Sequence, residues 1–337
     1  MWSTLNKLLT SVAKCRPHTV TLLNTRQISS EEISIPVPWG RIAGKWWGST
    51  KIKPILCLHG MQDNCGSFDR LIPILSANRD ISFLCLDFPG HGYSSPFPKG
   101  MFYDFLSYPI LVKRISNYFN WPTISLMGHS LGAMVSFMYT MLYPEKVNFL
   151  MCIDALKPVC SPMSAEVTQE ILDNFLKYES YKGLEDTVTY TLQEIIQKIV
   201  SKKSIDYEHV PLILKRNIAA SRKDPGKYYF IRDPILKVRL VFNWPQEQIE
   251  KDASRISCPI FMCKAEKVSY FEPKENFYAV VDILKQSSMD FDFHMLDGTH
   301  HLHLNEPEKI GSLMKCFLNK YCKLEEIDEC KSIFSES

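Results

Sequence analysis

The residues of this chain best suited to chemistry are Gly128-His129-Ser130-Leu131-Gly132. They follow an apolar run, residues 123–127, and precede a segment of helical spacing with Val135, Met138, Tyr139 and Leu142 on one face. This order predicts a strand, a tight turn and a helix, with the Ser130 hydroxyl projecting from the sheet at the turn. A serine hydroxyl becomes a nucleophile only when a base removes its proton and hydrogen-bond donors stabilise the oxyanion. The rest of the chain must supply both.

Three further segments have the composition to supply the base and the hydrogen-bond donors. Residues 53–61 form an apolar run that ends in His59-Gly60-Met61, and residues 81–94 form a second run that ends in a turn rich in Pro and Gly. Near the C-terminus, an alternating run is followed by Gly298-Thr299-His300-His301-Leu302-His303. A His-Gly loop, then the serine, then a histidine is the order found in α/β-hydrolases.

A longer stretch is more specific. Residues 58–71 read LHGMQDNCGSFDRL, and they resemble the serine hydrolase-like (Kraken-type) branch, in which His-Gly is followed by Gln-Asp-Asn and then by Phe-Asp-Arg-Leu. The stretches DFPGHG at 87–92 and HHLHLNEP at 300–307 are similar to that branch as well. The resemblance covers roughly residues 33–318 and implies an α/β-hydrolase fold with a serine nucleophile. It implies little about the substrate.

The predicted base is His300. Counted back from Glu306-Pro307-Glu308, it takes the position that the family's histidine occupies in the usual Gly-x-His loop. His301 is the alternative, because a slip of one residue exchanges the two, and we expect His303 to pack nearby. Three histidines in four residues could also bind a metal, but no further ligands stand at zinc spacing, so we predict no metal and no cofactor.

The acid of the predicted triad departs from the family pattern. Many relatives place an aspartate in a Gly-x-x-Asp turn, and here that turn reads Ala265-Glu266-Lys267-Val268. Valine cannot orient an imidazole. We therefore predict Asp154, which follows the apolar run 149–153, as the acid, with Glu266 as the alternative. A site with no working acid is a third possibility, since loss of this carboxylate can lower turnover by roughly 10⁴.

The predicted oxyanion hole consists of two backbone N–H groups, those of Met61 and Leu131. Preorganised donors of this kind contribute roughly 3–4 kcal/mol each. Gly60 lets the loop fold close to the serine. We expect His59, His91 and His129 to be structural residues of loops and turns.

Six apolar runs predict a mostly parallel sheet covered by helices on both faces, which is the α/β class. The runs are residues 54–58, 81–86, 123–127, 147–153, 259–263 and 290–296, after a β ribbon at 33–50. The long gap between the fourth and fifth runs has helical spacing and predicts an inserted cap, which buries apolar substrate. A packed subdomain without a lid role is the alternative.

These patterns predict five regions. Residues 1–30 form a leader, 31–159 the first part of the α/β-hydrolase core, 160–245 the helical cap, 246–318 the second part of the core and 319–337 a C-terminal extension. The leader has four basic residues, Lys7, Lys14, Arg16 and Arg26, and no acid. This composition is typical of a mitochondrial transit peptide. The alternative is a disordered tail of a cytoplasmic enzyme.

Composition excludes several functions. The net charge of +2 gives no field for nucleic acid, and no apolar run approaches the 18 residues of a membrane span. The 11 cysteines are scattered without a Cys-x-x-Cys pair, which fits a reducing compartment. The predicted partner is a small-molecule substrate, and no oligomeric state is predicted.

The function predicted from these observations is that of a serine hydrolase, carboxylesterase-like, which cleaves an ester or thioester of a small, apolar substrate through an acyl-enzyme on Ser130. The alternative is a catalytically weak α/β-hydrolase used as a binding protein, suggested by the missing aspartate. Epoxide hydrolases and dehalogenases share the cap and the Asp-x-Pro-Gly-His-Gly loop, but they need a carboxylate where Ser130 stands.

Overall fold

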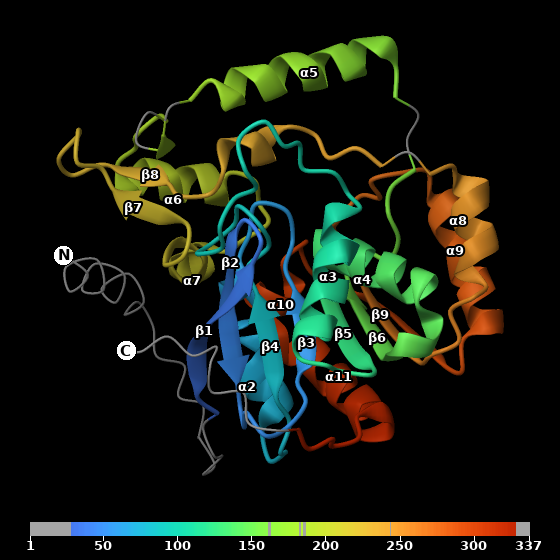
Figure 1. Ribbon diagram of the computed structural model, residues 1–337. Coiled ribbons are helices and arrows are strands. Elements are labelled where there is room, and N and C mark those ends of the chain that lie inside the picture. Colours follow the sequence, from blue (N-terminus) through green and yellow to red (C-terminus); the bar gives the residue numbers. More distant parts are fainter. Residues whose placement is uncertain (1–27, 161–162, 182, 185–186, 243, 328–337) are drawn as a thin grey trace.

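The centre of the structure is an eight-stranded sheet with the strand order β1-β2-β4-β3-β5-β6-β9-β10 (Figure 1). The computed structural model describes residues 28–160, 163–181, 183–184, 187–242 and 244–327. The strands are β1 (Ser30–Val37), β2 (Gly40–Trp47), β3 (Ile55–Leu58), β4 (Phe83–Leu86), β5 (Ile124–His129), β6 (Val147–Ile153), β9 (Ile260–Ala265) and β10 (Phe291–Leu296). β2 pairs antiparallel with β1 and β4, and the remaining neighbours pair parallel.

The predicted fold class is confirmed. Each of the six predicted strands is present, with ends within two residues of those expected from the apolar runs. β3, β4, β5 and β9 are buried along their whole length, which is why they lack the alternation of a half-exposed strand. The β ribbon forms the antiparallel pair β1–β2.

Helices cover both faces of the sheet (Figure 1). One apolar cluster joins the sheet to α3 (Ser107–Tyr118), α4 (Leu131–Leu142), α8 (Gln246–Ala253) and α9 (Lys274–Ser287). A second cluster joins it to α2 (Leu71–Ser76) and α11 (Pro307–Tyr321), with the short α10 (Leu302–Asn305) before α11. The core therefore lies in two layers, and the carboxyl ends of the parallel strands are left free for loops.

The segment between β6 and β9 adds α5 (Ala165–Glu179), α6 (Leu192–Val200), α7 (Val210–Leu214) and the short pair β7 (Ile218–Ala220) and β8 (Tyr228–Phe230). This pair of strands was not predicted. The segment has an apolar cluster of its own, centred on Ile195 and Leu214. Arg216 anchors it to the sheet through a buried ion pair with Asp87, at 2.7 Å.

Two predicted features lie outside the described residues. The leader falls almost entirely within residues 1–27, and the end of the C-terminal extension within 328–337. In the described part of the chain, every helix is too short or too polar to cross a membrane.

Candidate active site

Ser130 lies on a strained turn between β5 and α4. Its φ of 52° and ψ of −118° are outside the regions that L residues prefer, and its amide donates to the Ile153 carbonyl at 3.0 Å. The flanking glycines are required by packing. A Cβ on Gly128 would lie 2.3 Å from the Gly132 carbonyl carbon, and one on Gly132 would lie 1.9 Å from the Leu58 carbonyl oxygen. The close approach of strand and helix thus holds the serine at the carboxyl end of β5.

A chain of two hydrogen bonds joins Ser130, His300 and Asp154. The Ser130 hydroxyl lies 3.0 Å from His300 Nε2, and His300 Nδ1 lies 2.6 Å from Asp154 Oδ2. With Nδ1–H donating to the carboxylate, Nε2 keeps its lone pair toward the serine. These are the geometric relations of a nucleophile, a base and the acid that orients the base.

Asp154 occupies a tightly constrained position after β6. It is 1% exposed and has a φ of 55°. Its Oδ1 accepts hydrogen bonds from Lys264 Nζ, at 2.7 Å, and from the Ala265 amide, at 2.8 Å. Lys264 is itself buried and also donates to the carbonyls of Ala265 and Val268. The carboxylate therefore has a fixed orientation and a buried counter-ion.

The alternative acid is not brought to the histidines. Glu266 stands on the turn after β9 with an exposed side chain, and its amide donates to the Leu296 carbonyl at 2.9 Å. Within the described residues, its carboxylate makes no hydrogen bond with His300 or His301. The end of β9, where this turn begins, instead supplies Lys264 and Ala265 as donors to Asp154.

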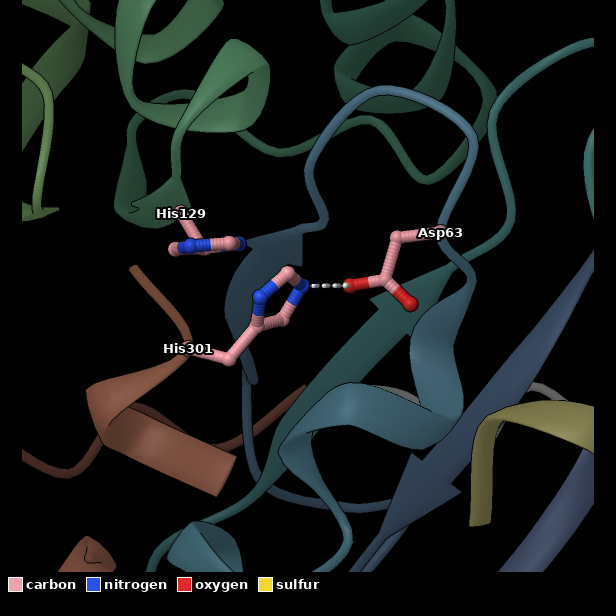
Figure 2. Close-up of side chains that lie close together, drawn as sticks. All are labelled: Asp63, His129 and His301. Atoms are coloured by element: carbon pink, nitrogen blue, oxygen red, sulfur yellow. Dashed lines mark ion pairs between the residues drawn. The ribbon is translucent and has the colours of Figure 1, made fainter. Parts of the chain in front are cut away.

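His301 faces away from Ser130. Its Nδ1 lies 2.6 Å from Ser204 Oγ and its Nε2 lies 3.5 Å from Asp63 Oδ2. Figure 2 shows the imidazole directed at the Asp63 carboxylate, with His129 beside it. Burial raises the pKa of Asp63, but His301, together with His59 and His303, lowers it by more, so the net shift is downward. Adjacent histidines thus serve two different carboxylates.

Two further histidines pack against this pair. His129 is buried, and its Nε2–H donates to the His300 carbonyl at 2.8 Å, which fixes the loop that carries His300. His303 is buried with its ring centroid 4.2 Å from that of His129. Burial lowers the pKa of His303 to about 3 and the pKa of His129 well below its usual value, so both stay neutral near pH 7.

Asp63, His129 and His301 are also the residues that could hold a metal. One ligand atom from each lies within 4.8 Å of the others. Zinc bonds of 2.0–2.1 Å would bring tetrahedral ligands to about 3.3 Å from one another, so the group would have to contract. The set comes from the end of β5 and from two loops distant from it in the sequence, which is why no spacing in the sequence indicated it.

The predicted oxyanion donors lie beside the serine. The amides of Met61 and Leu131 have no hydrogen-bond acceptor among the described residues, and both residues line the same cavity as Ser130. A Cβ on Gly60 would lie 3.2 Å from Ser130 Cβ, which shows how closely this loop approaches. The two amides are therefore free to bind an anionic oxygen.

Two buried histidines shape that loop. His59 Nε2 accepts from the Phe88 amide at 2.9 Å, and His91 Nε2 accepts from the Gln62 amide at 3.0 Å. Burial lowers the pKa of His59, and it lowers the pKa of His91 to about 3, so each nitrogen stays an acceptor. Both side chains therefore hold backbone amides in or next to this loop.

Two cavities open at the site, and Met61 lines both. The smaller, of about 340 Å³, contains Ser130 and Leu131 and is mainly apolar, with Phe105, Met134 and Phe242 among its walls. The larger, of about 790 Å³, contains His300 and His301 and extends under the segment between β6 and β9. Its walls include four cationic side chains, from Lys198, Lys202, Arg232 and Lys237.

Sequence reasoning missed Lys264, Asp63 and Ser204. Lys264 stands inside an apolar strand, and a lysine in a buried run is a signal that could have indicated a buried carboxylate partner. Asp63 and Ser204 meet His301 only through tertiary contacts.

The family model for the alpha/beta hydrolase fold matches residues 53–182. A protein of Drosophila melanogaster named "Probable serine hydrolase" is 38% identical over 299 residues, which are 87% of this chain and 88% of that one. A "Serine hydrolase-like protein" of Danio rerio is 30% identical over 87% of this chain and 90% of its own length.

Solved structures are similar as well. A hypothetical protein of Pseudomonas aeruginosa PAO1 superposes with a TM-score of 0.71 at 27% identity, over 86% of this chain and 99% of that one. A thioesterase domain from the curacin biosynthetic pathway gives a TM-score of 0.68 at 19% identity, over 85% and 99%. The second likeness concerns the fold alone.

Proposed function

The chain belongs to the serine hydrolase-like branch of the α/β-hydrolase superfamily, and we propose that it cleaves a carboxylic ester or thioester of a small, apolar substrate through an acyl-enzyme on Ser130. The family and the fold support hydrolase activity. The observation that carries the finer proposal is the hydrogen-bonded chain from Ser130 through His300 to Asp154.

In the proposed reaction, Ser130 Oγ attacks the substrate carbonyl carbon as its proton passes to His300 Nε2. The carbonyl oxygen becomes an oxyanion, which the amides of Met61 and Leu131 stabilise. The bond to the leaving oxygen or sulfur then breaks, and His300 returns the proton to that atom. Water attacks the acyl-enzyme with His300 again as base, which releases a carboxylic acid and restores the serine.

Asp154 has two tasks in this scheme. Its hydrogen bond selects the tautomer of His300 that can accept a proton from serine, and its negative charge stabilises the imidazolium that forms. Lys264 and the Ala265 amide hold the opposite oxygen, so Oδ2 stays directed at the ring. We assign Lys264 a positioning role.

The apolar cavity beside Ser130 supports an apolar acyl group. A volume of about 340 Å³ lined mainly by Phe, Met, Val and Leu accommodates a short or medium acyl chain and buries its apolar surface. Arg239 is its one charged lining residue among those described.

The direct test is labelling with a fluorophosphonate probe together with hydrolysis of p-nitrophenyl esters of graded acyl length. We expect the wild type to be labelled and to turn over esters, and Ser130→Ala to lose both. Ser180→Ala, at the exposed end of α5, is the matched control and should behave as the wild type. A wild type that is folded but neither labelled nor active would contradict the proposal and favour a binding protein.

A further inference from the structure

The larger cavity at the site carries a strong excess of positive charge. Lys198 comes from α6 and Lys202 follows that helix, whereas Arg232 and Lys237 come from the chain after β8. Asp63 is the one carboxylate among the described lining residues, and it already faces His301. Two segments far apart in the sequence therefore direct four cations at one space.

Three of these cations contact aromatic rings rather than carboxylates. Lys198 Nζ lies 4.9 Å from the Tyr190 ring, the Arg232 guanidinium 4.1 Å from the Phe230 ring, and Lys237 Nζ 5.2 Å from the Tyr178 ring. Cation–π contacts orient a charge without neutralising it. Across the described ranges, none of the four makes an ion pair.

The pKa values of two of the cations are lowered, which indicates that the cavity would favour an anion. Burial lowers the pKa of Arg232 to about 10, and burial together with Arg232, Lys177 and Lys198 lowers the pKa of Lys237. Arg232 is thus destabilised by loss of water, and Lys237 by loss of water and by the cations near it. A multiply charged anion between them would relieve both costs, since charge-assisted hydrogen bonds from arginine and lysine favour phosphate.

The position of this cavity identifies which part of a substrate would enter it. His300 lines the cationic cavity, whereas Ser130 and Leu131 line the apolar one. Because His300 delivers the proton to the departing atom, the leaving group must lie on the side of His300. The apolar cavity is then left for the acyl group.

From this arrangement we propose that the substrate is an ester or thioester whose leaving group is a phosphorylated alcohol or thiol, with the phosphate bound by Lys198, Lys202, Arg232 and Lys237. The inference rests on the proposed function and extends it to a substrate class. The bond that breaks is the acyl C–O or C–S bond, so the phosphate itself is bound and left intact.

Two matched pairs of substrates test the inference. Hexanoyl-4′-phosphopantetheine is compared with hexanoyl-pantetheine, and hexanoyl-glycerol 3-phosphate with monohexanoylglycerol. Within a pair, the acyl group and the scissile bond are the same and the phosphate differs. We expect kcat/KM to be at least about tenfold higher for the phosphorylated member of one pair, chiefly through KM, and the pair affected distinguishes a thiol from an alcohol source.

Substitution of the cations provides the second arm. In Arg232→Gln/Lys237→Gln, kcat/KM for the phosphorylated member should fall at least about tenfold more than for its uncharged partner. Lys198→Gln/Lys237→Gln replaces two exposed side chains and repeats the test if the first variant is unstable. Lys251→Gln on α8 removes an exposed lysine away from the cavity and should leave the preference as in the wild type (Figure 1).

Two results would overturn the inference while the proposed function stands: equal kcat/KM within both pairs, or a preference that the cation variants leave intact. If no ester is turned over, the proposed function fails, and calorimetric titration with coenzyme A and with glycerol 3-phosphate decides the inference by itself. Tighter binding of either by the wild type than by the cation variants supports it, and equal binding contradicts it.

Discussion

Two histidine–carboxylate pairs lie side by side in this molecule, and they differ in what surrounds them. His300 meets Asp154, a carboxylate fixed by Lys264 and the Ala265 amide, and its other nitrogen faces Ser130. His301 meets Asp63 at the longer distance of 3.5 Å, and its other nitrogen faces Ser204 in the inserted segment.

The difference shows that the surroundings, rather than the residue types, decide which pair can do chemistry. Both histidines have an acid and a serine as neighbours. The strained backbone of Ser130 and the free amides of Met61 and Leu131 are found beside His300 alone. We therefore expect the first pair to catalyse and the second to connect the sheet to the inserted segment.

The largest expected contrast is between the histidines themselves. His300→Ala should lower kcat for a p-nitrophenyl ester by a factor on the order of 10⁵–10⁶, because the serine loses its base. His301→Ala should lower it less than about tenfold, since it does not touch the reacting atoms. Steady-state kinetics on both variants measures the difference. Comparable losses of kcat would mean that both histidines take part in catalysis.

Substitution of Asp154 should also lower kcat more than substitution of Asp63, but the difference should be smaller than that between the two histidines. Asp154→Asn leaves the packing intact and should lower kcat by roughly 10⁴, because His300 takes the wrong tautomer. Asp63→Asn should cost less than about tenfold, and Glu266→Gln, on an exposed side chain, should leave kcat unchanged. If Glu266→Gln alone abolished turnover, the assignment of the acid would be wrong.

The stability of variants extends the comparison. Of the two carboxylates, Asp154 forms an ion pair with a buried lysine, Lys264. Lys264→Met should lower the free energy of unfolding by about 3–5 kcal/mol, since it leaves a buried carboxylate without its counter-ion. Urea denaturation measures this loss. Asp154→Asn/Lys264→Met should recover part of it, and a double variant as unstable as the sum of the two would exclude a direct coupling.

The smallest expected effect concerns His303, which packs near both pairs. Its folded pKa of about 3 lies below the unfolded value, so the unfolded chain binds a proton that the folded one does not. Its contribution to stability is complete above about pH 6.5 and is lost as the pH falls toward 3, by about 1.4 kcal/mol per pH unit. His303→Phe removes this term.

Urea denaturation of the wild type and His303→Phe at pH 7 and pH 5 measures this pH-dependent contribution of His303 to stability. The wild type should lose about 2 kcal/mol more than the variant over this interval. The remaining buried histidines, His59, His91, His129 and His209, are present in both proteins and cancel in the difference. Equal losses would show that His303 takes up a proton in the folded state.

Much of the fold and part of the site could be predicted from the sequence, because both are encoded locally. Fully apolar runs gave the strands, and the ends of two such runs placed Ser130 and Asp154 at the same edge of the sheet. The Gly-x-Ser-x-Gly spacing was informative because close packing excludes any side chain at Gly128 and Gly132.

The remainder depends on contacts between distant segments. A spacing argument could not decide between His300 and His301, because a rotation of the loop by one residue exchanges their directions. Lys264 meets Asp154 across neighbouring strands, and the cations of the inserted segment converge only once β7 has paired with β8. No local sequence pattern indicates these contacts.

The chain of hydrogen bonds at Ser130 has a consequence for how the protein matures. Its three members occur along the chain in the order Ser130, Asp154, His300, and His300 lies between β10 and α10. A nascent or truncated polypeptide that stops before residue 300 would contain the serine and its strained turn but no base. Turnover would then begin only after the segment that contains residue 300 has been made and has folded, so shorter copies would be chemically silent.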